Sequence, residues 1–108
     1  MNIIESMAIQ VANRLKEELI YNLSDYEGYL SLSNLEFGKK ILIIVFKNSP
    51  HFTIDVQKWN TKEEAFIGAK KEIKFYDFFK PRVMSDKDYI LFNKALLEEQ
   101  IFKFEERL

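Results

Sequence analysis

The spacing of apolar residues changes along this chain, and the change limits which elements it can form. Between residues 4 and 19 apolar side chains recur every three or four positions, which places them on one face of a helix. Between residues 29 and 58 they recur mostly at every second position, as in strands. The helical spacing returns after residue 61. The sequence therefore predicts one α+β domain over residues 1–108, with an N-terminal helix, a three-stranded antiparallel meander and two C-terminal helices.

Three strands are expected, at residues 29–37, 40–47 and 51–58. In the first, the alternation moves by one position after Leu32, which predicts a bulge near Ser33 and Asn34. The second is apolar at each position from 41 to 46, so we expect a central strand covered on both faces. The third alternates strictly, which favours an edge strand with one wet face. Gly38-Lys39 and Asn48-Ser49-Pro50 are expected to form the turns between them.

Two helices are expected after the strands. Thr61 and Glu64 fit a capping box at the start of a helix over residues 62–79, which Pro81 would end. Ser85 fits the N-cap of a last helix, which runs to the end of the chain. The core-facing stripe expected on this last helix is Ile90, Leu97, Ile101, Phe104 and Leu108. Because further apolar residues lie off this stripe, we expect the helix to be covered on several sides, either by a second copy in a twofold dimer or by the first helix.

The chain lacks most of the side chains that catalysis and metal binding use. It has no cysteine, and His51 is its single histidine, which argues against thiol catalysis and against zinc and iron–sulfur sites. No serine stands in a nucleophile elbow, and the three glycines lie too far apart for a phosphate-binding loop. We therefore expect no catalytic residue, no cofactor and no metal, and a non-enzymatic protein. His51 is expected to be a turn residue whose ring bonds a nearby carbonyl.

The longest uninterrupted apolar run, residues 41–46, is far shorter than the roughly 20 residues that cross a bilayer. The first residues carry neither a basic leader nor a cleavable apolar stretch. From these patterns we expect a cytoplasmic protein without a membrane partner.

Charge is distributed unevenly along the chain. Residues 1–38 carry a net charge of −4, residues 39–82 carry +5, and residues 83–108 carry −2. A basic patch in the middle segment would attract phosphates or an acidic protein surface. The alternative is that these lysines are solvated surface positions, because five acidic residues in the same segment dilute the field. The basic side chains are Lys39, Lys40, Lys47, Lys58, Lys62, Lys70, Lys71, Lys74, Lys80 and Arg82.

The predicted order of helix, three strands and helix over residues 3–79 resembles that of double-stranded-RNA-binding domains. In that family lysines at the start of the second helix lie across a phosphate groove, and the helix carries spaced alanines. Lys62, Ala65 and Ala69 stand at similar places in this chain. Glu63 and Glu64 depart from the pattern, because they bring negative charge where the family needs positive charge. The resemblance implies a nucleic-acid-binding surface in the middle of the chain.

Aromatic residues make up 15% of the chain and are concentrated in residues 75–79, where four of five side chains are rings. Successive side chains on a helix diverge by about 100°, so these rings cannot all face one core. Either the two C-terminal helices pack on different sides and bury all of them, or some contact a partner. As interface anchors we consider Trp59, Phe75, Phe78 and Phe79.

Together these patterns predict a small non-enzymatic protein that binds another protein as an inhibitor or adaptor. Its size and composition are typical of proteins of phages and other mobile elements, including inhibitors of host defence nucleases. The alternatives are a nucleic-acid-binding domain that uses residues 39–82 and a structural homo-oligomer, with a homodimer formed through the C-terminal helices. Candidate partner-binding residues are the four aromatic anchors and Lys39, Lys40, Lys58, Lys62, Lys70, Lys71, Lys74 and Arg82.

Overall fold

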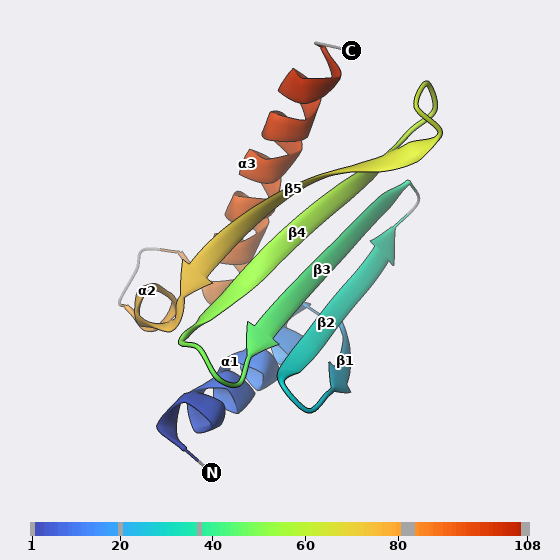
Figure 1. Ribbon diagram of the computed structural model, residues 1–108. Helices are drawn as coiled ribbons and strands as arrows, with labels where there is room; N and C mark the ends of the chain where they lie inside the picture. Colours follow the sequence, from blue (N-terminus) through green and yellow to red (C-terminus); the bar gives the residue numbers. More distant parts are fainter. Residues whose placement is uncertain (1, 20, 37, 81–83, 107–108) are drawn as a thin grey trace.

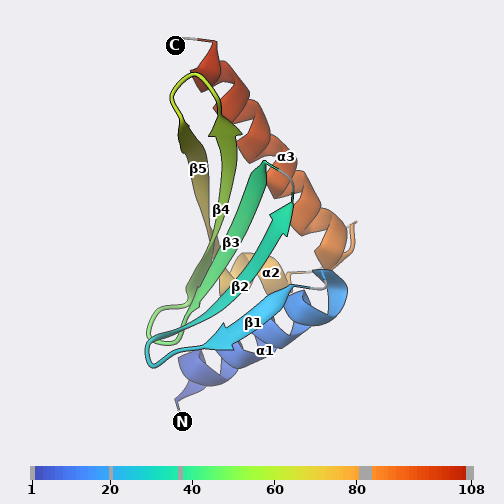
Figure 2. The same cartoon turned by 90° about the vertical axis from the view of Figure 1, so that its right-hand side faces the viewer.

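A five-stranded antiparallel sheet with helices on one side forms the body of the protein (Figures 1 and 2). The computed structural model describes residues 2–19, 21–36, 38–80 and 84–106. The strands lie in the sheet in sequence order, β1-β2-β3-β4-β5. In chain order the elements are α1 (Ile3–Leu19), β1 (Asn22–Asp25), β2 (Tyr29–Glu36), β3 (Lys39–Phe46), β4 (His51–Asn60), β5 (Ala65–Lys74), α2 (Phe75–Phe79) and α3 (Asp86–Glu105).

The α+β class is confirmed, but the prediction of three strands is wrong, because the sheet has five. The first strand that was missed, β1, consists of Asn22, Leu23, Ser24 and Asp25. Three of these four residues are typical turn residues, so their local preference favours a loop over a strand. Pairing with β2 over four positions, from Asn22 opposite Ser33 to Asp25 opposite Leu30, holds it extended.

The second missed strand, β5, occupies most of the segment expected to be a helix. It pairs with β4 at ten positions, from His51 opposite Lys74 to Asn60 opposite Ala65. The expected capping box at Thr61 is instead a hairpin loop. The N–H of Glu63 donates to Oδ1 of Asn60 at 2.8 Å, and Glu64 has a φ of 50°, which a right-handed helix does not contain. Pairing with β4 therefore determines that this segment forms a strand, although its local preference for helix or strand is ambiguous.

Because residues 62–74 form a loop and a strand, the order of elements no longer resembles that of double-stranded-RNA-binding domains. Lys62 lies in the β4–β5 loop, and Ala65 and Ala69 lie on β5. The second helix that the resemblance requires is not formed by these residues.

Three details of the central strands also differ from expectation. The register between β2 and β3 is continuous from Tyr29 opposite Phe46 to Glu36 opposite Lys39, so no bulge interrupts it. β3 is central, as predicted, but the helices that the structure describes cover only one of its faces (Figure 2). β4 is not an edge strand, because β5 pairs with its outer side. Gly38 adopts the positive φ, 71°, that its predicted turn requires.

The core lies between the sheet and the helices. Along β4, Phe52, Ile54 and Val56 are completely buried, as their alternation predicts. Burial of each such side chain stabilises the fold by about 1.5–3 kcal/mol. The helices and the remaining strands add a set of buried side chains that includes Ala8, Val11, Leu15, Leu32, Ile41, Ile43, Val45, Ile73, Ile90, Leu97 and Ile101.

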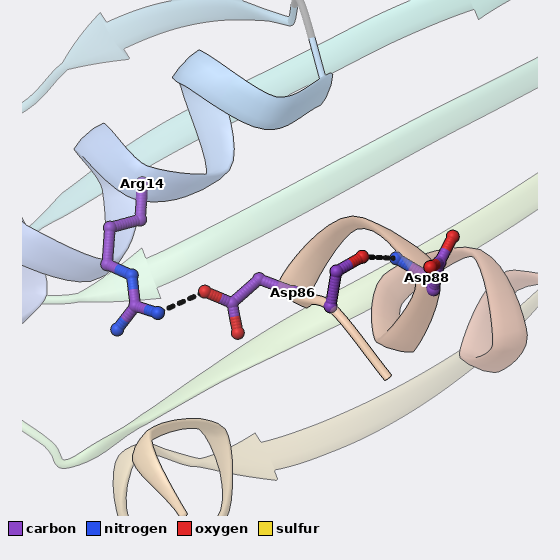
Figure 3. A network of polar contacts seen from close by, with 4 residues as sticks. Arg14, Asp86 and Asp88 are labelled. Atoms are coloured by element: carbon purple, nitrogen blue, oxygen red, sulfur yellow. Dashed lines mark hydrogen bonds and ion pairs between the residues drawn. The ribbon is translucent and has the colours of Figure 1, made fainter. Parts of the chain in front are cut away.

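Arg14 connects the three helices. Its guanidinium forms an ion pair with Asp86 at the start of α3, as Figure 3 shows. The same group lies 5.2 Å from the ring centre of Phe78 and 5.3 Å from that of Phe79 on α2. At the adjacent N-cap, the Asp88 N–H donates to Ser85 Oγ at 3.1 Å, which confirms the predicted start of this helix. Pro81, Arg82 and Leu108 lie outside the described residues.

Candidate interaction surface

None of the described helices lies over one face of the sheet, which we call the open face (Figures 1 and 2). Because side chains alternate along each strand, every second residue of β2, β3, β4 and β5 points to this face. Its middle consists of small polar, aliphatic and charged side chains. The register places them in two neighbouring rows: Ser31, Ile44, Thr53 and Glu72, then Ser33, Leu42, Asp55 and Lys70.

Exposed apolar side chains gather at one end of the open face, where the β4–β5 hairpin ends. Leu35, Trp59 and Phe66, which we call the tip cluster, are 76%, 46% and 46% exposed. The two rings are cross-strand neighbours and meet edge to face, with their centroids 5.4 Å apart. A depression of about 440 Å³ lies beside them, lined by Asn22, Ser33, Asn34, Leu35, Lys40 and Phe66. Exposed rings beside a depression are typical of the anchors of protein interfaces.

The opposite end of the open face is also aromatic. Tyr26 stacks on Tyr29 with ring centroids 4.9 Å apart, and Phe46 lies 4.8 Å from the His51 ring. A second depression of about 360 Å³ adjoins this end and is lined by Ser49, Pro50, His51, Glu72, Lys74 and Tyr76.

His51 contacts a hydroxyl and not the carbonyl expected from the sequence. Its Nδ1 lies 2.8 Å from Ser49 Oγ, and its Nε2 lies 3.8 Å from a Glu72 carboxylate oxygen. A serine, a histidine and a carboxylate are the side chains of a hydrolase triad. In a triad, however, the carboxylate is hydrogen-bonded to the ring, and 3.8 Å is too long for such a bond. The geometry therefore supports a structural role, in which Ser49 and His51 hold the turn between β3 and β4.

The alternation of the strands divides the predicted basic segment between the two sides of the sheet. Lys39, Lys58 and Lys71 point to the helix side. There Lys71 Nζ donates to Asn93 Oδ1 at 2.8 Å, and Lys39 Nζ lies 3.3 Å from Glu98. Lys39 and Lys71 thus connect the sheet to α3. The three lysines lie on the other side of the sheet from the lysines of the open face.

Lys40, Lys70 and Lys74 point to the open face and are exposed. The described part of the chain contains no ion pair that involves any of the three. Asp55 and Glu72 share the face, so its charge is mixed with a small positive excess. Lys62 lies in the exposed β4–β5 loop, and Arg82 lies outside the described residues.

Of the four predicted aromatic anchors, only Trp59 is strongly exposed. Phe75 and Phe78 are each 1% exposed, and Phe78 packs edge to face on Phe52 at 5.5 Å. These two rings belong to the core and are not presented to a partner. Phe79 is partly buried beside Phe78 and Arg14.

Two members of the tip cluster, Leu35 and Phe66, were not identified from the sequence. The bulge expected near Ser33 and Asn34 would turn Leu35 to the same side as Leu32, whereas the continuous register turns it to the open face. Phe66 was assigned to a helix, and it lies opposite Trp59 only because β5 is a strand. The spacing of Ile67, Ala69 and Ile73, which Lys71 interrupts, is the weak period-two signal that could have identified the strand.

No family model matches the chain, and no significant match to a curated protein or a solved structure was found. In the described ranges, acidic and histidine side chains nowhere form a group of three that could hold a metal ion. None of the described helices has the length and apolar character needed to span a membrane.

Proposed function

We propose that this protein binds another protein through the open face of its sheet and acts as an inhibitor or adaptor. One observation carries the proposal. The same surface combines the exposed tip cluster, a depression beside it, and three lysines without an ion pair among the described residues. Protein interfaces combine exposed aromatic anchors with charged side chains in this way.

The chemistry of the face indicates what kind of partner it fits. Trp59 and Phe66 need an apolar surface that removes their rings from water. Lys40 and Lys70 need carboxylates, which would attract the partner over long range and orient it on arrival. The partner is therefore a protein with an apolar site bordered by acidic residues.

The biological setting is part of the same proposal. A cysteine-free chain of this size and composition suits a cytoplasmic inhibitor or adaptor encoded by a phage or another mobile element. A nuclease of host defence is one kind of target that such a protein would block.

The test has two steps. The full chain is used to capture a partner from host cells, and the affinity of the purified pair is then measured for variants. Trp59→Ala and Phe66→Ala should each weaken binding by about tenfold or more, because truncation of an interface anchor costs more than ~1.4 kcal/mol.

The matched control is Phe104→Ala. Phe104 is 49% exposed, close to the 46% of both tip rings, but it lies on the last turn of α3, away from the open face. It should leave the affinity unchanged. If the tip variants bind as tightly as the wild type, the open face is not the binding surface.

The combination of rings and lysines on an open antiparallel sheet also favours a second candidate, the binding of single-stranded nucleic acid. Sheets of this kind stack bases on exposed aromatic side chains while cations contact the backbone. Labelled single strands and duplexes are titrated at low and moderate salt. Binding that weakens steeply with salt and is lost in Lys70→Glu would replace the protein-binding proposal, and absence of binding at low salt would remove this candidate.

A further inference from the structure

A second apolar surface lies on the outer side of α3, on the opposite side of the molecule from the open face. Ile90, Leu97 and Ile101 attach this helix to the sheet. Side chains on its outer side include Leu91, Phe92, Leu96 and Phe102, which are 39%, 50%, 36% and 56% exposed. Together with the small, exposed Ala95 between them, we call these residues the α3 stripe.

The first helix does not cover this stripe. α1 meets α3 at its N-terminal end, where Arg14 pairs with Asp86. Figure 2 shows α3 running away from α1 along the outside of the sheet. The sequence predicts that this helix is covered either by a second copy or by the first helix. In the part of the chain that the structure describes, α1 does not cover the α3 stripe, so the stripe faces outward.

We propose that the α3 stripe is the interface of a twofold homodimer in which α3 packs antiparallel against α3 of a second copy. The distribution of charge along the helix supports a second copy as the occupant. Asp88 lies in the first turn, and Lys103, whose Nζ also lies 3.3 Å from Glu99 of the same helix, lies in the last turn. An antiparallel alignment centred between Ala95 and Leu96 brings each Asp88 level with Lys103 of the other copy, whereas a parallel alignment would oppose like charges.

The shape of the stripe fits the same arrangement. Ala95 lies next to the proposed twofold axis, where a small side chain lets two helices approach to about 8–10 Å. Phe92 and Phe102 flank it, and each half-exposed ring leaves on the order of 100 Å² uncovered. With the two leucines, the two copies together supply several hundred Å² of apolar surface, roughly the apolar centre of a dimer of standard size.

The experiment measures the mass of the full chain by sedimentation over a hundredfold range of concentration around about 10 µM. The expected result is a species of twice 12.9 kDa that dissociates on dilution. Phe92→Glu should raise the dissociation constant by about a hundredfold or more, because it places a charge in the apolar centre. The matched control is Trp59→Glu, an exposed ring on the open face, which should leave the mass unchanged.

Charge reversal tests the antiparallel arrangement independently of the apolar contact. Asp88→Lys should weaken the dimer by about fivefold to tenfold, and the double variant with Lys103→Glu should recover most of that loss. Far-ultraviolet circular dichroism checks that each variant retains its helix content. A wild type that is monomeric throughout, a dimer that Trp59→Glu disrupts and Phe92→Glu does not, or a double variant no tighter than Asp88→Lys would each overturn the proposal.

Discussion

On β3, Ile43 and Ile44 are neighbours in the sequence and lie on opposite faces of the sheet. Ile43 is completely buried under the helices, whereas Ile44 is partly exposed on the open face between Ser31 and Thr53. The same chemical group therefore stabilises the core on one face and is offered to solvent on the other. A continuous apolar run in a sequence thus does not show that both faces of a strand are covered.

Two neighbouring lysines of β5, Lys70 and Lys71, likewise lie on opposite faces of the sheet. Lys71 reaches Asn93 on α3, while its neighbour Lys70 points to the open face and has no ion pair among the described residues. A segment that is basic in sequence is thereby divided between lysines that connect elements of the fold and lysines that are exposed on the open face.

The largest expected difference between the two faces is in the free energy of unfolding. Ile43→Ala should lower it by about 3 kcal/mol, because it removes buried methylenes and leaves a cavity. Ile44→Ala should lower it by about 1 kcal/mol or less, because that side chain is only partly removed from water. Urea unfolding of both variants measures the difference. Equal losses would mean that the open face is covered in solution.

Loss of the hydrogen bonds between the sheet and α3 should lower the free energy of unfolding by an intermediate amount. Asn93 is 1% exposed; its Oδ1 accepts from Lys71 and its Nδ2 donates to the Tyr89 carbonyl at 2.8 Å. Asn93→Ala should cost about 1–2 kcal/mol, because both hydrogen bonds are lost inside the interface. The control on the open face is Lys70→Ala, which should change stability by no more than ~0.5 kcal/mol in the same urea experiment. A larger loss in the control would show that Lys70 has a structural partner.

A substitution in the β4–β5 loop should change the free energy of unfolding by less, and the sign of the change distinguishes a hairpin from a helix. Glu64 has a φ of 50°, so Glu64→Gly should stabilise the protein by about 0.5–1 kcal/mol by relieving backbone strain. In the helix expected from the sequence, the same change would destabilise by about 1 kcal/mol. Thermal unfolding distinguishes the two, with Glu63→Gly as a control that lacks the positive φ. Destabilisation by Glu64→Gly would contradict the hairpin.

The elements that the sequence predicts correctly are those with a long, regular spacing of apolar residues. α1, β3, β4 and the Ser85 start of α3 belong to this group, because their local pattern and their packing agree. β1 and β5 were missed because pairing with a neighbouring strand, and not their own residues, holds them extended. In β5 the inward-facing Lys71 interrupts the alternation, and its Ala, Lys and Glu residues favour a helix locally.

The open face was predictable only in part, for the same reason. Trp59, Lys40, Lys70 and Lys74 were identified as single residues, since exposure of a ring or a charge can be judged from type. Their gathering on one face with Leu35 and Phe66 depends on the register of four strands. The register also places Lys39, Lys58 and Lys71 on the helix side of the sheet, and no count of charge along the chain can separate them from the others.

The most direct test of the open face as the binding surface compares two adjacent lysines of β5. The dissociation constant of the captured partner is measured for Lys70→Glu and Lys71→Glu, which change the same charge on opposite faces of one strand. Lys70→Glu is expected to weaken binding by about tenfold or more, and Lys71→Glu by no more than about twofold. A partner that tolerates Lys70→Glu and is lost with Lys71→Glu would place the binding surface on the helix side and contradict this account.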